Sequence, residues 1–329
     1  MIDGLVVVDK PAGWTSHDVV ARCRRVFGQK RVGHAGTLDP GATGVLLVGL
    51  GQVTRLLRFV AELAKSYEGE MVLGIETTTL DDEGDVVVEH EMRDVALDDV
   101  RSAAARFVGE IDQVPPMVSA VKVGGRRLHE LARQGVDVER PARRVRVDRF
   151  DVADTPAANV YRIVVECSSG TYVRVLAADV GRALGGGAHL RHLRRTAIGA
   201  FGLDRAQPLD AIGPDSVLAP AAVVSHLERC IVDAGLAAVV AHGRVLGLEA
   251  LGAAGDGPWA VLDERGALLA VYERYDADRA KPAVVLAPSS SDSLNDPRSQ
   301  RDPDRSENEG AAGSGDTATA AGSGDAVDR

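Results

Sequence analysis

The segment from Arg31 to Leu50, RVGHAGTLDPGATGVLLVGL, constrains the fold most, because it sets one carboxylate in a glycine-dense loop before an apolar strand-like run. Glycine permits left-handed or tightly bent backbone and leaves room for a substrate to approach. The glycines that flank the carboxylate are Gly33, Gly36, Gly41 and Gly44. Pro40 removes a backbone donor and fixes its own φ. We therefore expect the backbone to shape this loop and to display Asp39 as a candidate nucleophile.

The composition is that of a globular intracellular protein. A length of 329 residues allows two domains and a tail, and 45% hydrophobic residues support a true core. Aromatic residues make up only 4%, so Tyr67 and Tyr172 stand out as candidate pocket residues. Cys23, Cys167 and Cys230 are far apart, which predicts neither a disulfide framework nor a zinc site. With no signal peptide and no apolar run long enough to span a membrane, we expect a cytoplasmic protein.

The net charge of −10 argues at first against a nucleic-acid partner, but its distribution along the chain is uneven. Residues 289–329 hold nine Asp and Glu against four Arg, a net of −5, which leaves −5 for the rest. Basic residues cluster within that rest: Arg22, Arg24, Arg25, Lys30 and Arg31; Lys122, Arg126 and Arg127; Arg143, Arg144, Arg146 and Arg149; Arg191, His192, Arg194 and Arg195. Such clusters can bind RNA, although a solvated surface explains any one of them equally well.

Hydrophobic spacing predicts strands and helices that alternate without strict βαβ repetition. Period-two or short apolar runs predict strands at 4–8, 45–48, 67–73, 86–89, 145–150 and 161–166. Helical spacing predicts helices at 18–27 with Ser16 as N-cap, at 97–108 and at 172–184. The pattern is typical of an α+β fold with a mixed, largely antiparallel sheet and flanking helices.

Changes in amino-acid composition along the chain predict three domains. The first covers 1–208, and Ala- and Gly-rich sequence follows it. A small β-rich domain is expected at 225–288, where WAVLDERGALLAVYERY (259–275) is typical of a hairpin. From residue 289 on, Ser, Asp, Gly and Ala dominate, which predicts a disordered acidic tail over 289–329.

Separated motifs in order from Gly4 to about Leu203 resemble the bacterial tRNA pseudouridine-55 synthase family of the TruB type. They are GLVVVDKPAGWTSHDVV, HAGTLDPGATGVL, KSY, PPMVSAVKVGGRRLHELARQG, CSSGTYVRVLAADVG and HLRRT. The resemblance implies a pseudouridine synthase catalytic fold over 1–208 and a PUA-like RNA-binding domain over 225–288. It implies isomerisation of a flipped-out uridine at position 55 in the T-loop of tRNA, with no cofactor and no metal. It favours a monomer that binds the tRNA elbow without an obligate protein partner or a membrane.

The resemblance also implies roles for individual residues. As catalytic residues, Asp39 would be the nucleophile, Arg174 would pair with it, and Tyr67 would stack on the uracil near its C5 proton. Tyr172 and Leu193 would line the pocket. His34 would insert into the RNA loop, and Lys10 and Asp81 match positions near the pocket. The substrate and RNA-binding residues implied are thus His34, Tyr172, Leu193, Lys10 and Asp81.

Taken without the resemblance, each of these residues also has an ordinary structural explanation. Asp39 before Pro40 fits a turn, and Lys10 and Asp81 fit turns as well. Tyr67 and Tyr172 fit half-buried strand positions. Other enzymes are weakly supported, because a retaining glycosidase needs a second carboxylate about 5 Å away and no GxxxxGK[ST] motif occurs. A tRNA-binding protein that assists RNA folding is the more serious alternative.

The charge distribution gives a first prediction. Deletion of residues 289–329 removes net negative charge, so RNA affinity should stay unchanged or improve by up to about threefold. The measurement is a filter-binding titration with an unmodified tRNA transcript at several salt concentrations. A large loss of affinity would show that the tail is itself a contact surface.

Overall fold

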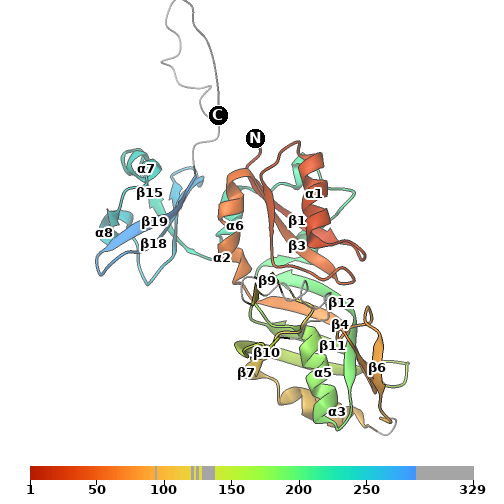
Figure 1. Ribbon diagram of the computed structural model, residues 1–329. Coiled ribbons are helices and arrows are strands. Elements are labelled where there is room, and N and C mark those ends of the chain that lie inside the picture. The colour runs from red at the N-terminus through yellow and green to blue at the C-terminus, as the bar shows by residue number, and fades with distance from the viewer. Residues whose placement is uncertain (93–94, 120–121, 124–125, 128–137, 287–329) are drawn as a thin grey trace, which may run out of the picture. The chain divides into compact units, whose positions relative to one another are not determined.

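The computed structural model describes residues 1–92, 95–119, 122–123, 126–127 and 138–286 (Figure 1). The predicted tail, 289–329, lies outside these residues, as do the side chains of the predicted cluster Lys122, Arg126 and Arg127. Among the described residues, no helix is long and apolar enough to cross a membrane.

A ten-stranded sheet forms the larger part of the fold. Its strands are β1 (Gly4–Lys10), β2 (Val32–Ala35), β3 (Thr43–Leu50), β4 (Lys65–Leu73), β7 (Gly109–Gln113), β10 (Arg143–Asp154), β11 (Val160–Cys167), β12 (Ala188–Ile198), β13 (Phe201–Gly202) and β14 (Gln207–Pro208). The order is β14-β1-β3-β12-β4-β11-β10-β7, with β2 paired to β3 and β13 to β12. The pairs β1–β14 and β3–β12 are parallel and the others antiparallel, which confirms the predicted mixed, largely antiparallel sheet.

The helices flank this sheet or belong to the C-terminal part. They are α1 (Ser16–Val26), α2 (Leu57–Ala61), α3 (Leu97–Ala105), α5 (Val173–Ala183), α6 (Pro220–Val223), α7 (Ala234–Ala241) and α8 (Leu248–Leu251), with 3-10 turns η1 (Gly51–Arg55), η2 (Leu203–Arg205) and η3 (Pro214–Ser216). Helix α3 ends three residues before the predicted end at 108. Helix α5 matches the predicted 172–184 within one residue at each end.

The predicted N-cap of α1 was wrong. Thr15, not Ser16, caps the helix: its hydroxyl accepts a hydrogen bond from the Asp18 amide, and the Asp18 carboxylate accepts one from the Thr15 amide. This reciprocal capping box satisfies two donors that the helix leaves open. Ser16 is buried instead, and its hydroxyl bonds the backbone of Leu38.

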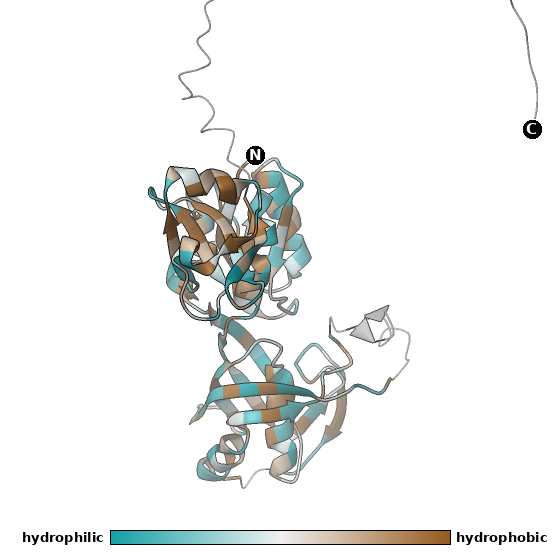
Figure 2. Ribbon diagram, turned by 90° about the vertical axis from the view of Figure 1, so that its left-hand side faces the viewer, coloured by the Kyte–Doolittle hydropathy of each residue, from teal (hydrophilic) through white to brown (hydrophobic). Residues whose placement is uncertain are grey.

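Burial along the strands follows the predicted alternation. Exposed and buried residues alternate along β10, and Figure 2 shows hydrophobic and hydrophilic residues alternating along strands in this half of the molecule. The buried faces of β4, β10 and β11 pack with α3 and α5 around Met71, Ile163 and Leu176. A second core lies around β1, β3 and α1, where Val6, Val19 and Leu46 are fully buried.

Strand β12 is the main element that sequence reasoning missed. Its sequence, AHLRHLRRTAI, mixes charged and apolar residues and shows no clean period of two. Irregularities in its pairing with β4, between Arg191 and Arg194 and between Arg195 and Ala197, break that period, and His192 takes a positive φ of 54°. A β-bulge of this kind re-aims side chains.

A separate five-stranded sheet lies in the C-terminal part. Its strands are β15 (Glu228–Val232), β16 (Leu246–Gly247), β17 (Trp259–Asp263), β18 (Leu268–Arg274) and β19 (Arg279–Val285), in the order β15-β17-β18-β19-β16. The antiparallel pair β17–β18 confirms the predicted hairpin. Two short hairpins complete the fold, β5 (Ile75–Thr77) with β6 (Val86–Glu89) and β8 (Lys122–Val123) with β9 (Arg126–Arg127).

The two halves of the large sheet meet where β3 pairs with β12 through Thr43–Arg194 and Gly44–Arg195. Gly44 has a φ of +99°, and a Cβ there would lie 2.1 Å from the Arg195 carbonyl oxygen. Only glycine allows the two backbones to approach this closely.

Replacement of Gly44 by alanine should therefore destabilise the protein. The strained φ and the backbone clash together should lower the free energy of unfolding by at least about 2 kcal/mol. Urea denaturation followed by circular dichroism measures this. The matched control is Gly213→Ala, where a Cβ meets nothing within 4 Å and the change should stay within about 0.5 kcal/mol. Equal stability of the two variants would contradict the proposed close contact.

Candidate active site

The loop between β2 and β3 presents Asp39, and buried polar contacts hold it on both sides. The Ser16 hydroxyl donates to the Leu38 carbonyl at 3.2 Å and accepts from the Leu38 amide at 3.0 Å. On the other side, the Lys10 ammonium donates to the Pro40 carbonyl at 3.0 Å. The backbone is thus fixed at the residues before and after Asp39, whose side chain stays 39% exposed.

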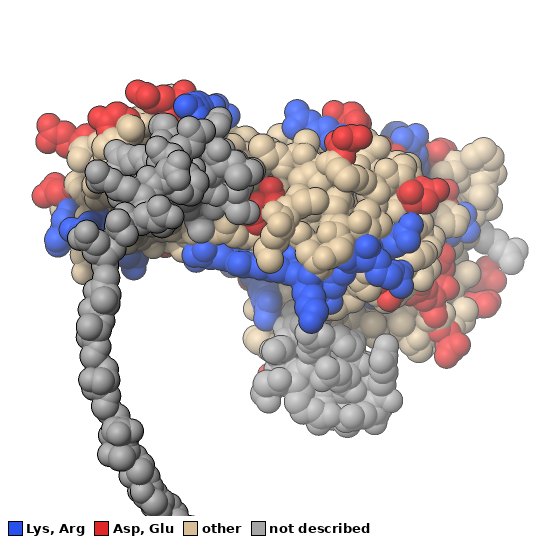
Figure 3. Space-filling view, turned by 90° about the horizontal axis from the view of Figure 1, so that it is seen from above, with Lys and Arg blue, Asp and Glu red and all other residues tan. Residues whose placement is uncertain are grey.

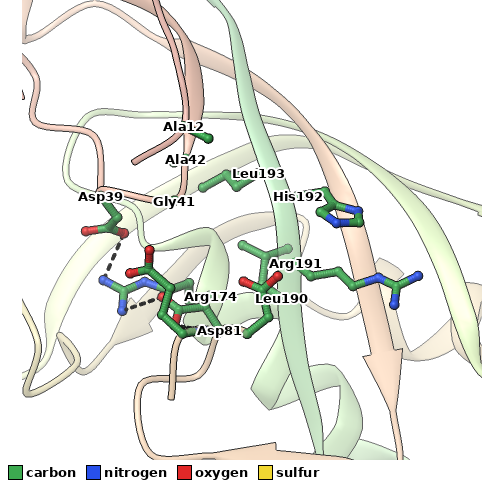
Figure 4. Close-up of a pocket in the computed structure, with 12 residues that line it drawn as sticks. Ala12, Asp39, Gly41, Ala42, Asp81, Arg174, Leu190, Arg191, His192 and Leu193 are labelled. Atoms are coloured by element: carbon green, nitrogen blue, oxygen red, sulfur yellow. Dashed lines mark hydrogen bonds and ion pairs between the residues drawn. The ribbon is translucent and has the colours of Figure 1, made fainter. Parts of the chain in front are cut away.

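Arg174, in the first turn of α5, faces Asp39 (Figure 4). One guanidinium nitrogen lies 3.0 Å from an Asp39 carboxylate oxygen, and the other lies 3.2 Å from Asp81. The same nitrogens donate to the carbonyls of Thr79 and Val118 at 2.8 and 3.0 Å. The Arg174 side chain is only 4% exposed. A buried guanidinium with four acceptors is locked in place, so it holds the Asp39 carboxylate in one orientation.

Opposing effects act on the charge of Asp39. Burial in the pocket raises the pKa of its carboxyl group above the usual value, and the nearby Asp81 carboxylate raises it further. Arg174 lowers the pKa most strongly, and Lys10 also lowers it. The cations thus favour the ionised form in a site where burial disfavours it.

Asp81 is placed by a strained turn between β5 and β6. Leu80 takes a positive φ of 64°, which is unusual for a leucine. The Leu190 amide donates to the Leu80 carbonyl at 3.0 Å, which ties this turn to β12. Thr79 donates a short hydrogen bond to the Asp81 carboxylate. Backbone strain of this kind concentrates at functional sites.

Two adjoining cavities of about 300 and 260 Å³ meet at Asp39, Arg174 and Leu193. The smaller one is also lined by Tyr67 and Tyr172, so the structure brings these predicted pocket residues together. Tyr67 comes from β4 and is 8% exposed. Burial raises the pKa of its hydroxyl, so it is neutral at physiological pH. The cavity thus combines one carboxylate with an aromatic and an apolar wall.

Gln113, at the end of β7, fixes the position of Tyr172. Its side-chain oxygen accepts from the Tyr172 amide at 2.8 Å, and its side-chain nitrogen donates to the Tyr172 carbonyl at 3.1 Å. Gln113 is 3% exposed. The paired contacts hold the peptide that begins α5 and therefore help to place Arg174 two residues later.

Arg195 and Lys65 are buried cations that sequence reasoning did not place in the pocket. Arg195 was predicted within a surface cluster, but it is 1% exposed and donates to the carbonyls of Val45 and Gly36 at 2.7 and 2.9 Å. Lys65 donates to the carbonyls of Ala61 and Leu63. Burial lowers the pKa of Lys65 to about 8. Recognition of β12 as a strand would have supplied the signal, because residues 193 and 195 would then share a face.

Lys10 and His34 lie beside the cavities rather than in their lining. The Lys10 ammonium is fully buried and donates to the carbonyls of Pro11, Trp14 and Pro40, which uses its three protons. Burial lowers the pKa of Lys10 to about 8. The His34 ring, on β2, meets the His17 ring edge to face, with 5.4 Å between the two ring centroids. Burial lowers the pKa of His34 to about 4, so its ring is neutral at physiological pH.

The rest of the lining of the larger cavity includes both acidic and basic side chains. Asp81, Asp82 and Glu83 line it on one side, and Arg191 and His192 on the other. Burial raises the pKa of Glu83, and Asp81 adds to the effect. The described residues hold no group of three or more His, Cys, Asp or Glu side chains arranged to bind a metal ion.

The predicted basic clusters differ in how their charges are balanced. The arginines of β10 are paired: Arg144 with Asp112, Arg146 with Asp148 and Arg149 with Asp151. Arg191 and Arg194 are paired with Glu70 and Asp9. Arg22, Arg24, Arg25, Lys30 and Arg31 form no ion pair with a described residue. Figure 3 shows Lys and Arg side chains gathered in a band along one edge of the face seen from above.

The sequence matches known families over most of its length. Residues 24–173 match the model described as TruB family pseudouridylate synthase (N terminal domain). Residues 174–233 match tRNA pseudouridylate synthase B C-terminal domain. Similar curated proteins include tRNA pseudouridine synthase B of Mycobacterium sp. (strain KMS), 49% identical over 87% of this chain and 97% of that protein. The protein of the same name from Mycobacterium tuberculosis (strain ATCC 25618 / H37Rv) is 44% identical over 87% and 96%.

Solved structures show the same fold. A chain in a crystal structure of a Cbf5-Nop10-Gar1 complex has a TM-score of 0.66 and 27% identity, covering 87% of this chain and 84% of that chain. A chain in the structure of an H/ACA RNP bound to a substrate RNA containing 2'-deoxyuridine has a TM-score of 0.66 and 23% identity, covering 87% and 85%. The predicted fold class is therefore confirmed.

The charges around Asp39 make its titration a test of the site. Replacement of Asp81 by asparagine removes a like charge, so the pKa of Asp39 should fall. Replacement of Arg174 by glutamine removes the main opposing cation, so that pKa should rise. Carboxyl ¹³C NMR across a pH series measures both shifts.

A surface variant, Asp98→Asn, serves as control and should leave the titration of Asp39 unchanged, because Asp98 pairs with Arg101 on the exposed face of α3. Identical titration curves for Asp39 in all variants would contradict the electrostatic coupling described above.

Proposed function

The chain belongs to the TruB family of pseudouridylate synthases and isomerises uridine to pseudouridine in tRNA, and we propose that Asp39 is the nucleophile of this reaction. The pair of Asp39 and Arg174 carries the proposal, because their 3.0 Å contact sets an accessible carboxylate beside a buried cation. A carboxylate nucleophile needs access to substrate, ionisation and a group that orients it. Tyr67 and Leu193 wall the cavity into which this carboxylate faces.

The reaction needs one carboxylate and a pocket in which the base can turn. The bond between ribose C1′ and N1 of uracil breaks, the base rotates, and C1′ bonds to C5. The C5 proton leaves and N1 takes up a proton, so the product is an isomer of the substrate. Asp39 forms a covalent bond to the ribose or to the base during this sequence and is released at its end. Tyr67 stacks on the uracil near C5, and Tyr172 and Leu193 keep the base in the pocket.

The proposed target is uridine 55 in the T-loop of tRNA. An enzyme that acts on a base must first take it out of the stack. We assign His34 to the vacated place, because its ring is only partly buried and is neutral. A neutral aromatic ring stacks readily between bases.

Lys10 has a different role in this proposal from Arg174 and Asp81. Its three donors bond to backbone carbonyls, so it shapes the Asp39 loop and has no ammonium proton left for the RNA. Asp81 orients Arg174 through the guanidinium nitrogen that does not contact Asp39. We also propose that the protein acts as a cytoplasmic monomer without an obligate protein partner. Its free, buried cysteines are compatible with a reducing compartment.

Replacement of Asp39 by asparagine tests the nucleophile. The variant keeps the shape of the side chain and its loop, so RNA affinity should stay within about threefold, while turnover should fall by at least about 10⁴-fold because the nucleophile is lost. The measurement is tritium release from C5-tritiated uridine in an unmodified tRNA transcript, with the released site mapped to the T-loop. Binding is measured in parallel on the same transcript.

Asp215→Asn is the control, since Asp215 is an exposed residue of η3, and it should release tritium at the wild-type rate. Turnover by Asp39→Asn would exclude Asp39 as nucleophile. Intact tRNA binding with no release by the wild-type protein would instead support the alternative, a tRNA-binding protein that assists folding.

A further inference from the structure

A second pocket, of about 560 Å³, lies outside the two cavities that contain Asp39. It forms where the end of β1, the start of β3, helix α1 and the turn after β14 come together. Its lining is Asp9, Lys10, Pro11, Trp14, Arg22, Arg25, Thr43, Arg194, Pro208, Leu209 and Asp210. The volume falls within the range of roughly 300–1,000 Å³ that small-molecule sites occupy.

The pocket carries positive charge that the protein leaves unbalanced. Arg22 and Arg25 project from α1, and neither forms an ion pair with a described residue. The Asp9 carboxylate is already bonded to Arg194 at 2.7 Å, so it does not neutralise them. The remaining acid, Asp210, is exposed. Most arginines of the large sheet are paired, whereas Arg22 and Arg25 have no carboxylate partner to give up before they donate to a phosphate.

The uncharged part of the pocket wall is apolar and partly aromatic. Trp14 is half-buried and packs against the core that includes Leu209, and Pro11 and Pro208 also line the pocket. Leu209 is 7% exposed, so this wall is anchored in the protein core. A site lined by both arginines and an indole ring matches a nucleotide, whose phosphate is anionic and whose base has a flat apolar face.

The pocket is joined to the active site through shared backbone. Lys10 lines the pocket and its ammonium holds the Pro40 carbonyl next to Asp39. Across the sheet, Arg194 lines this pocket, whereas its neighbours Leu193 and Arg195 line the Asp39 cavity. At the loops the two sites adjoin, because Ala12 and Ala42 line the larger Asp39 cavity and their chain neighbours Pro11 and Thr43 line this pocket. We therefore expect one RNA strand to contact both sites along these loops.

We propose that this pocket binds a second nucleotide of the RNA substrate, with its phosphate on Arg22 and Arg25 and its base against Trp14. The inference rests on the proposed function, because it takes RNA as the substrate. The second nucleotide anchors the strand while the target uridine enters the Asp39 cavity. Its contribution is therefore to RNA affinity and not to the chemical step.

The test compares two double variants that remove the same charge. Arg22→Gln with Arg25→Gln changes the pocket, and Lys30→Gln with Arg31→Gln changes exposed basic residues outside it. The pocket variant should raise the Kd for an unmodified tRNA transcript about tenfold at 0.15 M salt and reduce the salt slope by about 1 to 2. The control should change Kd by less than about threefold. The maximal rate at saturating RNA should be unchanged in both.

Tryptophan fluorescence gives a second readout that does not depend on charge. The chain has two tryptophans, and Trp259 is fully buried in the C-terminal sheet, so quenching by bound RNA reports on Trp14. Addition of the transcript should quench the wild-type protein, and Trp14→Phe should lose most of that signal. Uridine and adenosine monophosphates are titrated separately and should quench only at millimolar concentration.

Each outcome decides the proposal. Equal affinities and salt slopes for the two double variants, or no quenching of Trp14 by RNA, would overturn it. Quenching by a mononucleotide at micromolar concentration, without displacement by RNA, would also overturn it and assign the pocket to a free nucleotide. Failure of these binding tests alongside normal tritium release would leave the proposed function intact. Loss of tritium release in the wild-type protein would instead remove the proposed function, whatever the pocket binds.

Discussion

The close parallel contact between β3 and β12 is the constraint on which the rest of the structure depends. Gly44 lets the β3 backbone approach that of Arg195, and this joins the two halves of the large sheet. The Asp39 loop comes from one half, whereas Tyr67 and Arg174 come from the other. The site therefore exists only where the halves meet, and its geometry is set by backbone contacts far stiffer than a surface loop.

Buried cations around the site are satisfied mainly by backbone carbonyls. Lys10, Lys65 and Arg195 each donate to main-chain oxygens, and Arg174 adds two carboxylates. This arrangement fixes the backbone without neutralising the cations, because a carbonyl carries no net charge. Lys10 and Arg195 accordingly lower the pKa of Asp39 from a distance, while Arg174 does so by direct contact. Structural support and stabilisation of the carboxylate thus come from the same side chains.

Sequence patterns predicted the elements whose hydrophobic period was regular. The strands at 67–73 and 161–166 and the helix at 172–184 were found because their apolar residues follow a period of two or of 3.6. Strand β12 was missed because its bulges break the period and its arginines are paired or buried. The N-cap of α1 was misassigned because Thr15 and Ser16 are equivalent cap formers in sequence, and only the buried contact to Leu38 separates them.

The same limit applies to the site residues. The grouping of Asp39, Tyr67, Arg174 and Leu193 in one place was implied only by the family resemblance, because their motifs lie far apart in the chain. Gln113 carries no motif, and it acts only through the Tyr172 peptide, so no local pattern predicts it. Contacts of a side chain with remote backbone become visible only in three dimensions.

Whether an arginine can bind RNA depends on its neighbours in the fold more than on the number of arginines in a segment. Strand β10 holds four arginines and helix α1 three, yet three of the four on β10 are each bonded to a nearby carboxylate. A paired arginine must give up its partner before it binds a phosphate, whereas Arg22 and Arg25 need only displace water and ions. An acidic protein can thus offer a basic surface to RNA, because local pairing and not the net charge of −10 decides which arginines are available.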